Sequence, residues 1–176
     1  NDVRSVRRLL VEHYGWPADC ICALTDDEEG AMPTRRNISE RLRWLAEDAR
    51  PGDALFFHFS GHGSQQEDPD GFEEDGMNET ILPVDFAQAG MLTDDEVGDV
   101  IVKPLPDGAR LTVLLDCCHS GTGLDLPFHW TGSSWREETN PYHSRGDVLL
   151  ISGCEDHDCS ADVSSLYGAA GGAMTT

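Results

Sequence analysis

The chain has 176 residues, the length of one ordinary domain and too short for two. It holds 12 Lys and Arg against 33 Asp and Glu, and its net charge of −21 argues against binding to nucleic acid or to an anionic membrane surface. No apolar run reaches the ~20 residues of a membrane-spanning helix, and the amino-terminal stretch lacks the apolar core of a signal peptide. The six cysteines do not form the dense framework of a small secreted domain, so we expect a soluble, cytoplasmic protein.

The amino-terminal third is expected to hold two helices with a short strand between them. Apolar residues recur at helical spacing over residues 2–14, and Gly15 begins the punctuation that ends this helix. Residues 20–24 alternate in polarity and predict a strand. After an acidic loop, Asn37 and Glu40 resemble a capping box before an amphipathic helix.

The rest of the chain carries three strongly apolar strands, at residues 54–59, 110–116 and 147–152. A short strand is expected near residues 80–85, and Thr93 with Glu96 caps a third helix. A long irregular stretch, residues 121–146, separates the last two strands. Apolar strands alternating with helices indicate an α/β fold, a three-layer sandwich in which helices flank a mostly parallel central sheet.

Two of the apolar strands run directly into Gly-rich turns that hold one reactive side chain each. Residues 55–65 read LFFHFSGHGSQ and contain His62, and residues 111–123 read LTVLLDCCHSGTG and contain Cys118. Functional groups gather at the carboxyl ends of parallel strands, so we expect these two side chains to lie close together. A thiol needs a neighbouring base to act as a nucleophile at neutral pH. His62 suits this role better than His119, which points to the opposite face from Cys118.

Other interpretations of these residues stay open. Strand alternation separates Cys117 from Cys118, so one points into the fold and the other into the site. His62 could be a turn residue with a satisfied ring, and Cys118 a small buried hydrophobe. A zinc site is disfavoured because no C-x-x-C pair occurs and two adjacent cysteines do not suit tetrahedral coordination.

The two motifs resemble the paired histidine and cysteine motifs of the metacaspases, which are cysteine peptidases of the caspase-like fold. The resemblance covers nearly the whole chain and includes LTDD, PTRRNI, DGFEEDGMNETILPVDF, VKPLPDG and SGCEDHDCSAD. It implies that Cys118 is the nucleophile, that His62 is the base, and that protein or peptide substrates are cut, in a family linked to programmed cell death. Backbone N–H groups near Gly63 and Cys118 are candidates for an oxyanion hole.

Two polar residues share a face with the proposed dyad. Asp116 lies two residues before Cys118, and Ser60 lies two residues before His62. A carboxylate beside the nucleophile favours a cationic substrate group, although Asp116 could instead accept backbone N–H groups at the strand end. The resemblance implies an acidic pocket selective for Arg or Lys, formed by Asp116, Ser60 and an aspartate of LTDD, which we assign to Asp26.

A second acidic group comprises Asp94, Asp95 and Asp125. Acids in the first turn of a capped helix are stabilised by the helix dipole alone, so by composition Asp94 and Asp95 need no metal. Many metacaspases need Ca²⁺, and the resemblance implies a calcium site at these three aspartates. Asn78 stands where the family has a fourth aspartate, so the site keeps an amide oxygen but loses one charge. The acidic loop 67–79 does not match the EF-hand pattern.

The resemblance also divides the chain. Residues 1–126 correspond to the large subunit, residues 127–146 to a loop, and residues 147–176 to the start of the small subunit, so we expect one peptidase domain truncated at both ends. Arg136 and Arg145 in the loop fit the predicted specificity and are candidates for self-cleavage. The sequence therefore predicts a calcium-dependent cysteine endopeptidase. The alternative is a catalytically silent interaction domain with the same fold.

Overall fold

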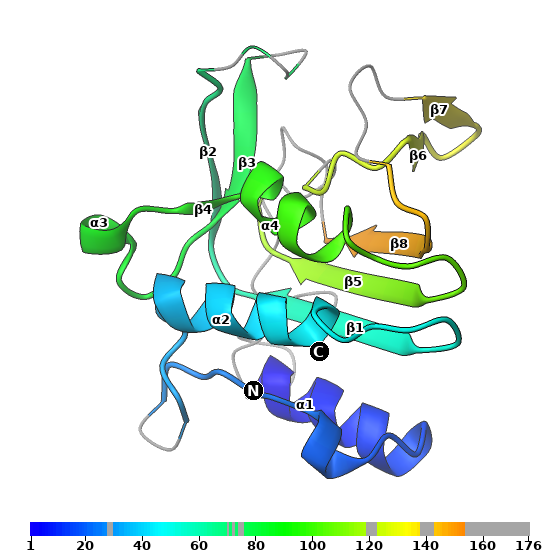
Figure 1. Ribbon diagram of the computed structural model, residues 1–176. Coiled ribbons are helices and arrows are strands. Elements are labelled where there is room, and N and C mark those ends of the chain that lie inside the picture. The colour runs from blue at the N-terminus through cyan, green and yellow to red at the C-terminus, as the bar shows by residue number, and fades with distance from the viewer. Residues whose placement is uncertain are drawn as a thin grey trace.

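The centre of the molecule is a parallel sheet of three strands. The computed structural model describes residues 1–27, 30–69, 71, 73, 76–118, 123–137 and 143–153. The strands are β1 (Ala54–Ser60), β5 (Arg110–Asp116) and β8 (Asp147–Ser152), paired in the order β1-β5-β8 (Figure 1). They are the three apolar runs that the sequence predicts, and β5, which is apolar along most of its length, takes the central place.

Helices cover both faces of this sheet. One face packs against α2 (Arg35–Ala46) and α4 (Asp94–Ile101), and the core between them contains Ile101, Leu111 and Val113, which are 0% exposed. The opposite face is covered at β1 by α1 (Asp2–Arg8) and its π-helical continuation η1 (Leu9–His13). There the rings of Trp16 and Phe56 meet edge to face, with centroids 6.4 Å apart. The expected three-layer α/β architecture is confirmed.

A second, antiparallel sheet extends upward from the main sheet in the view of Figure 1. Its strands are β2 (Gly63–Glu67), β3 (Met77–Ile81) and β4 (Leu92–Thr93), in the order β2-β3-β4. The sequence predicts a turn where β2 lies, because GSQQE has no apolar residue. The strand expected near residues 80–85 lies earlier, and it ends two residues before Pro83, which has no N–H to continue the ladder.

The strand expected at residues 20–24 is wrong. The chain instead makes a 3-10 turn, η2 (Ala18–Cys20), and Leu24 forms a single bridge with Ala31. Alternating polarity does not suffice for a strand when the backbone meets no neighbouring strand over more than one residue.

The capping box expected at Asn37 and Glu40 is also wrong. The helix begins earlier, at the N-cap Thr34, whose hydroxyl accepts a hydrogen bond from the N–H of Asn37 at 3.2 Å. Glu40 instead pairs with Arg36 one turn before it, at 2.7 Å. The capping box at Thr93 and Glu96 is confirmed.

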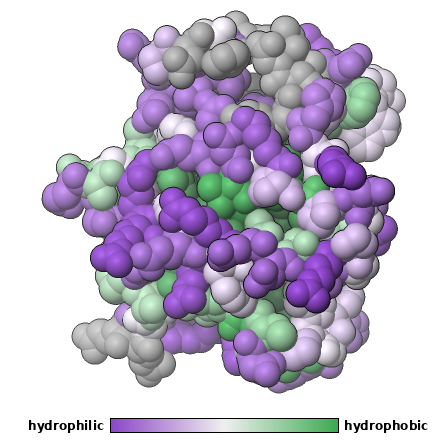
Figure 2. Space-filling view, in the orientation of Figure 1, coloured by the Kyte–Doolittle hydropathy of each residue, from purple (hydrophilic) through white to green (hydrophobic). Residues whose placement is uncertain are grey.

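The stretch expected to be irregular contains a hairpin of β6 (Phe128–Trp130) and β7 (Trp135–Glu137), in which the Trp130 and Trp135 rings lie 5.5 Å apart. A short helix, α3 (Phe86–Ala89), connects β3 to β4 in the second sheet. Within the described ranges, no helix has the length and apolar character to cross a membrane. Hydrophilic residues cover most of the face shown in Figure 2, in keeping with the acidic composition.

Candidate active site

The turn after β1 and the turn after β5 lie against each other. Ser60 and Asp116, the last residues of the two strands, are register partners, and the N–H of Gly61 donates to the Asp116 carbonyl at 3.3 Å. A Cβ added to Gly63 would lie 2.1 Å from the carbonyl oxygen of Cys118, so only glycine fits at this approach. The structure thus brings the histidine motif and the cysteine motif together at the carboxyl edge of the sheet.

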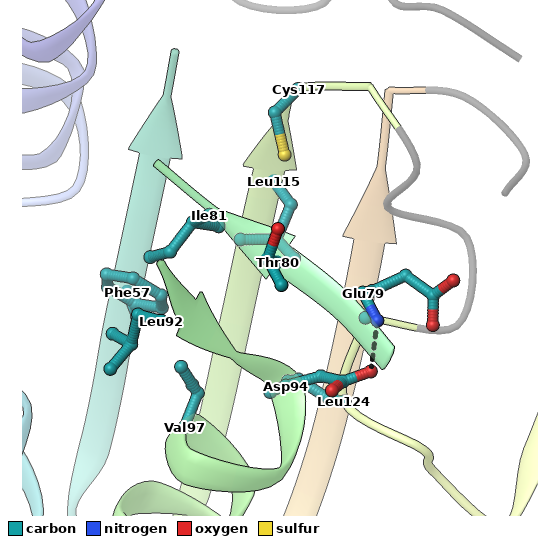
Figure 3. A pocket seen from close by; sticks show the side chains of 11 residues that line it. Phe57, Glu79, Thr80, Ile81, Leu92, Asp94, Val97, Leu115, Cys117 and Leu124 are labelled. Carbon is teal, nitrogen blue, oxygen red and sulfur yellow. Dashed lines mark hydrogen bonds between the residues drawn. The ribbon is translucent and has the colours of Figure 1, made fainter. Parts of the chain in front are cut away.

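The two adjacent cysteines differ in exposure. Cys117 is 2% exposed, and its sulfur points into a small cavity of ≈ 20 Å³ beneath the strand ends (Figure 3). Cys118 is half-buried and His62 is exposed, so both can be reached from outside. The His62 carbonyl accepts a hydrogen bond from the N–H of Leu82 at 3.0 Å, which fixes the turn that carries the imidazole. A nucleophile must be accessible to its substrate, and Cys118 meets this condition better than Cys117.

An acidic group lies on the face of the sheet that α1 covers. Asp116 is 2% exposed, and the hydroxyl of its register partner Ser60 donates to the carboxylate of Asp2 at 2.7 Å. Asp2 is the first residue of α1, and sequence analysis did not select it because an acid in the first turn of a helix is common.

The place of Asp26 in this group stays a prediction. Asp26 is exposed, and no hydrogen bond or ion pair between described residues joins it to Ser60 or Asp116. Its neighbour Asp27 accepts a hydrogen bond from the Arg4 guanidinium at 2.6 Å. The structure therefore puts Asp2, rather than an aspartate of the LTDD motif, beside Ser60.

A second acidic group gathers carboxylates from three segments. Oxygens of Glu73, Asp94 and Asp125 lie within 4.8 Å of one another. Burial, and then the charges of Asp125 and Glu79, raise the pKa of Asp94 to about 9. Asp125 is 8% exposed and adopts φ 44°, a left-handed conformation that is costly for any residue other than glycine. The chain thus holds repelling groups together in a strained arrangement.

Backbone groups fix this acidic group in place. The N–H of Glu79 donates to one Asp94 carboxylate oxygen at 3.1 Å (Figure 3), and the N–H of Asp95 donates to the other at 2.9 Å. Asn78 precedes Glu79 on β3, and its side-chain oxygen is buried with no hydrogen-bond partner among the described residues. Carboxylate and amide oxygens are the ligands that Ca²⁺ prefers. The donor set therefore fits a calcium ion, and the ion would offset the repulsion among the carboxylates.

The predicted metal ligands are only partly brought together. Asp94 and Asp125 meet, whereas Asp95 is half-buried beside them and is not one of the three clustered carboxylates. Glu73, which was not among the predicted ligands, is the third. It comes from an acidic loop without a recognisable ligand spacing, so no sequence signal separates it from its acidic neighbours.

The candidate self-cleavage positions are both accessible. Arg136 lies in β7 and Arg145 shortly before β8, and both side chains are exposed. His119 and the segment 154–176, which holds most of the expected small-subunit part, lie outside the described residues.

Comparison with known proteins identifies relatives of the chain. The family profile described as "Metacaspase, peptidase C14 domain" matches residues 1–127. Metacaspase-1 of Botryotinia fuckeliana is 46% identical over 172 residues, which is 96% of this chain and 41% of that protein. Metacaspase-2 of Arabidopsis thaliana is 41% identical over 188 residues, which is 99% of this chain and 45% of that protein.

A solved structure resembles the chain in fold. A protein from Geobacter sulfurreducens matches with a TM-score of 0.57 and 27% identity over 82% of this chain and 60% of that chain. The chain spans 36–45% of the length of the curated relatives it matches.

Proposed function

Because the chain belongs to the metacaspase family, we propose that it carries the catalytic centre of a calcium-dependent cysteine endopeptidase that cuts after Arg or Lys. The observation that carries the proposal is the contact between the two strand-end turns, with Gly63 packed on the Cys118 carbonyl. This contact holds an exposed imidazole and an accessible thiol on adjoining turns, which is the arrangement that nucleophilic catalysis by cysteine requires.

In the proposed reaction, His62 accepts the proton of the Cys118 thiol, and the thiolate attacks the carbonyl carbon of the scissile peptide bond. The C–N bond breaks as His62 gives the proton to the leaving amine, and the acyl group remains on Cys118 as a thioester. Water, deprotonated by His62, then hydrolyses the thioester and frees the thiol. Backbone N–H groups near Gly63 and Cys118 are candidates to stabilise the oxyanion in both steps.

The acidic group near the dyad supports a preference for basic side chains. Asp116 and Asp2 provide two carboxylates, and Ser60 provides a hydroxyl that already donates to Asp2. A guanidinium or ammonium group from the substrate offers such carboxylates a charged partner, whereas an aspartate side chain would be repelled. The net charge of −21 acts in the same direction at longer range.

The second acidic group supports a requirement for Ca²⁺. Bound there, the ion would supply charge neutralisation and order rather than bond-breaking chemistry. Glu73, Asp94 and Asp125 would hold it with carboxylates, and Asn78 has a buried amide oxygen to add. β3 connects this group to the dyad, because it ends at Ile81, next to the residue whose N–H binds the His62 carbonyl. Ordering of the acidic group by the ion would therefore also fix the position of the turn that carries His62.

Cleavage of fluorogenic peptides tests the reaction and its specificity together. We expect hydrolysis of substrates with Arg or Lys at P1 and none with Asp, with Cys118→Ala as the inactive control. Preference for Asp at P1 would contradict the acidic pocket. No hydrolysis of any substrate by the folded full-length protein with calcium would favour the catalytically silent interaction domain.

Titration of activity with free Ca²⁺ tests the metal site. Asn78→Asp restores the family's charge and should lower the calcium concentration for half-maximal activity, whereas Asp94→Asn should raise it. Full activity of the parent protein in excess chelator would show that these acids serve only as helix-capping and surface charge.

A further inference from the structure

A half-buried histidine that the proposed reaction does not use lies beneath the acidic group of Asp2, Ser60 and Asp116. His58 is in β1, two residues before Ser60, so the two side chains share the face of the sheet that α1 covers. Its register partner on β5 is Leu114, two residues before Asp116. The imidazole therefore lies one row of side chains further into the sheet than the pair formed by Ser60 and Asp116.

The surroundings of this imidazole come from three elements. β1 itself contributes Ser60, which is neutral. α1 contributes the carboxylate of Asp2, which accepts a hydrogen bond from the Ser60 hydroxyl at 2.7 Å. β5 contributes the buried carboxylate of Asp116. Asp2 and Asp116 are the charged groups that act on His58. Burial lowers the pKa of His58 below the ordinary value of 6.5, and the two aspartates partly oppose this effect.

The ring nitrogens of His58 need an explanation beyond packing. Nε2 is buried and has no hydrogen-bond partner among the described residues. Leaving such a polar atom unpaired lowers folding stability, and a phenylalanine of similar shape at this position would avoid that cost. A residue that is costly for folding and that lies next to two carboxylates is a candidate for a functional role.

The protonation state of His58 decides what the two carboxylates can bind. When the imidazole is neutral, the negative charges of Asp2 and Asp116 attract a cationic group. An imidazolium is itself a cation one row below them, so it pairs with the same carboxylates and repels a second positive group. The two states therefore differ in their affinity for a basic side chain, and the difference is a coupling between proton binding and ligand binding.

We propose that His58 is a specificity-determining residue that sets the charge of the acidic pocket formed by Asp2, Ser60 and Asp116. The neutral imidazole lets the two aspartates bind a guanidinium or ammonium group, and the imidazolium excludes that group. The inference rests on the proposed function, since it takes this pocket to receive the P1 side chain. His58 acts through the two aspartates and touches no reacting atom, so it is a positioning residue rather than a catalytic one.

Binding of agmatine, a small guanidinium compound, separates this role from catalysis. Isothermal titration calorimetry would use the full-length protein with Cys118→Ala, at pH 7.5 and pH 5.5. This parent is compared with His58→Gln and His58→Phe variants and with a control, His13→Gln, which removes an exposed histidine of η1. We expect affinity in the parent and in the control to fall by up to about tenfold at the lower pH, which is the limit that competition with one proton sets at pH 5.5 for an imidazole whose pKa lies below 6.5. Both His58 variants should keep nearly the same affinity at the two pH values.

Proton release gives a second readout. Titration near pH 6 in two buffers of different ionisation enthalpy should show protons released on agmatine binding by the parent and by His13→Gln, and almost none by the His58 variants. If both His58 variants fail to fold, the imidazole of His58 can be followed by NMR in the parent. By reciprocity agmatine must then lower the pKa of His58.

The outcomes separate the inference from the function on which it rests. An equal loss of affinity at low pH with and without His58, or an NMR titration that agmatine leaves unchanged, overturns the role of His58 alone. If agmatine binds none of the folded proteins at pH 7.5, the proposal of the acidic pocket itself is overturned, and the role of His58 with it.

Discussion

Replacement of Gly63 by alanine tests whether the contact between the two strand-end turns is needed for catalysis. The new Cβ would lie 2.1 Å from the Cys118 carbonyl oxygen, 3.2 Å from the carbonyl carbon and 3.3 Å from the Cys117 sulfur. The two closest atoms belong to backbone, which cannot rotate out of the way. Since carbon and oxygen approach to about 3.3 Å in weak contacts, the turns must separate by about 1 Å.

The expected loss of activity follows from that displacement. His62 directly precedes Gly63, and the new methyl group meets the carbonyl of Cys118. The shift therefore falls between the proposed base and the proposed nucleophile. A misplacement of about 1 Å lowers catalysis on the order of 100-fold. This corresponds to about 2.7 kcal/mol of transition-state stabilisation, and overpacking adds a cost of about 1–3 kcal/mol to folding stability.

The assay compares kcat/KM on an Arg substrate, at saturating calcium, with that of a matched variant in the same turn. Gly61→Ala is the control, because the three atoms nearest to its new Cβ all belong to the Phe59 ring, the first at 2.9 Å, and a side chain can tilt away. Thermal melts check that both variants are folded. The rate of alkylation by iodoacetamide should also fall in Gly63→Ala, because Cys118 is held further from its base. If the two folded variants differ less than threefold in kcat/KM, the contact does not position the dyad.

The remaining predictions concern the nucleophile, the acidic cluster and self-processing. Cys118→Ala should leave no measurable initial rate and Cys117→Ala most of it, and the reverse pattern would make the buried cysteine the nucleophile. In excess chelator, Asp94→Asn should raise the free energy of unfolding at pH 7 by up to about 4 kcal/mol, because the fold raises the pKa of this carboxyl from 3.8 to about 9. The metal-free parent therefore loses stability as the pH rises from 3.8 toward about 9. Urea melts at pH 5, 7 and 8.5 would contradict the role of Asp94 if the free energy of unfolding fell equally with pH in the parent and in Asp94→Asn. Calcium should produce a cut after Arg136 or Arg145 in intact-mass spectra, absent from Cys118→Ala, and an active enzyme that stays uncut would reject self-processing.

The main sheet could be predicted because its strands are defined by local sequence. β1 and β5 are apolar over most of their length, and in the structure β5 is largely buried and β1 largely half-buried. β2 could not be predicted, because Gly63–Glu67 has no apolar residue and becomes a strand through its pairing with β3. The prediction of where α2 begins was wrong for a related reason. Thr34 and Asn37 are both good N-cap residues, and tertiary packing selects between them.

The same distinction applies to the site. His62 and Cys118 could be singled out because each follows a buried strand in a turn that the sequence marks with glycine. Asp2 could not, because its partner Ser60 lies 58 positions away and only the packing of α1 on β1 brings them together. Glu73 is one of several acids in its loop, and its proximity to Asp94 is a property of the folded chain.

The π turn in η1 determines the angular orientation of α1. Trp16 is anchored at one end, where its N–H donates to the Leu10 carbonyl at 3.0 Å and its ring contacts Phe56. The N–H of Tyr14 bonds the carbonyl of Leu9, five residues earlier, at 3.2 Å, so this turn holds one residue more than an α-helical turn. Deleting one residue within η1 would restore α-helical winding and rotate α1 by about 100° relative to its anchor. Asp2 would then move away from Ser60, so the one extra residue in this turn decides whether the acidic group beside Ser60 has one carboxylate or two.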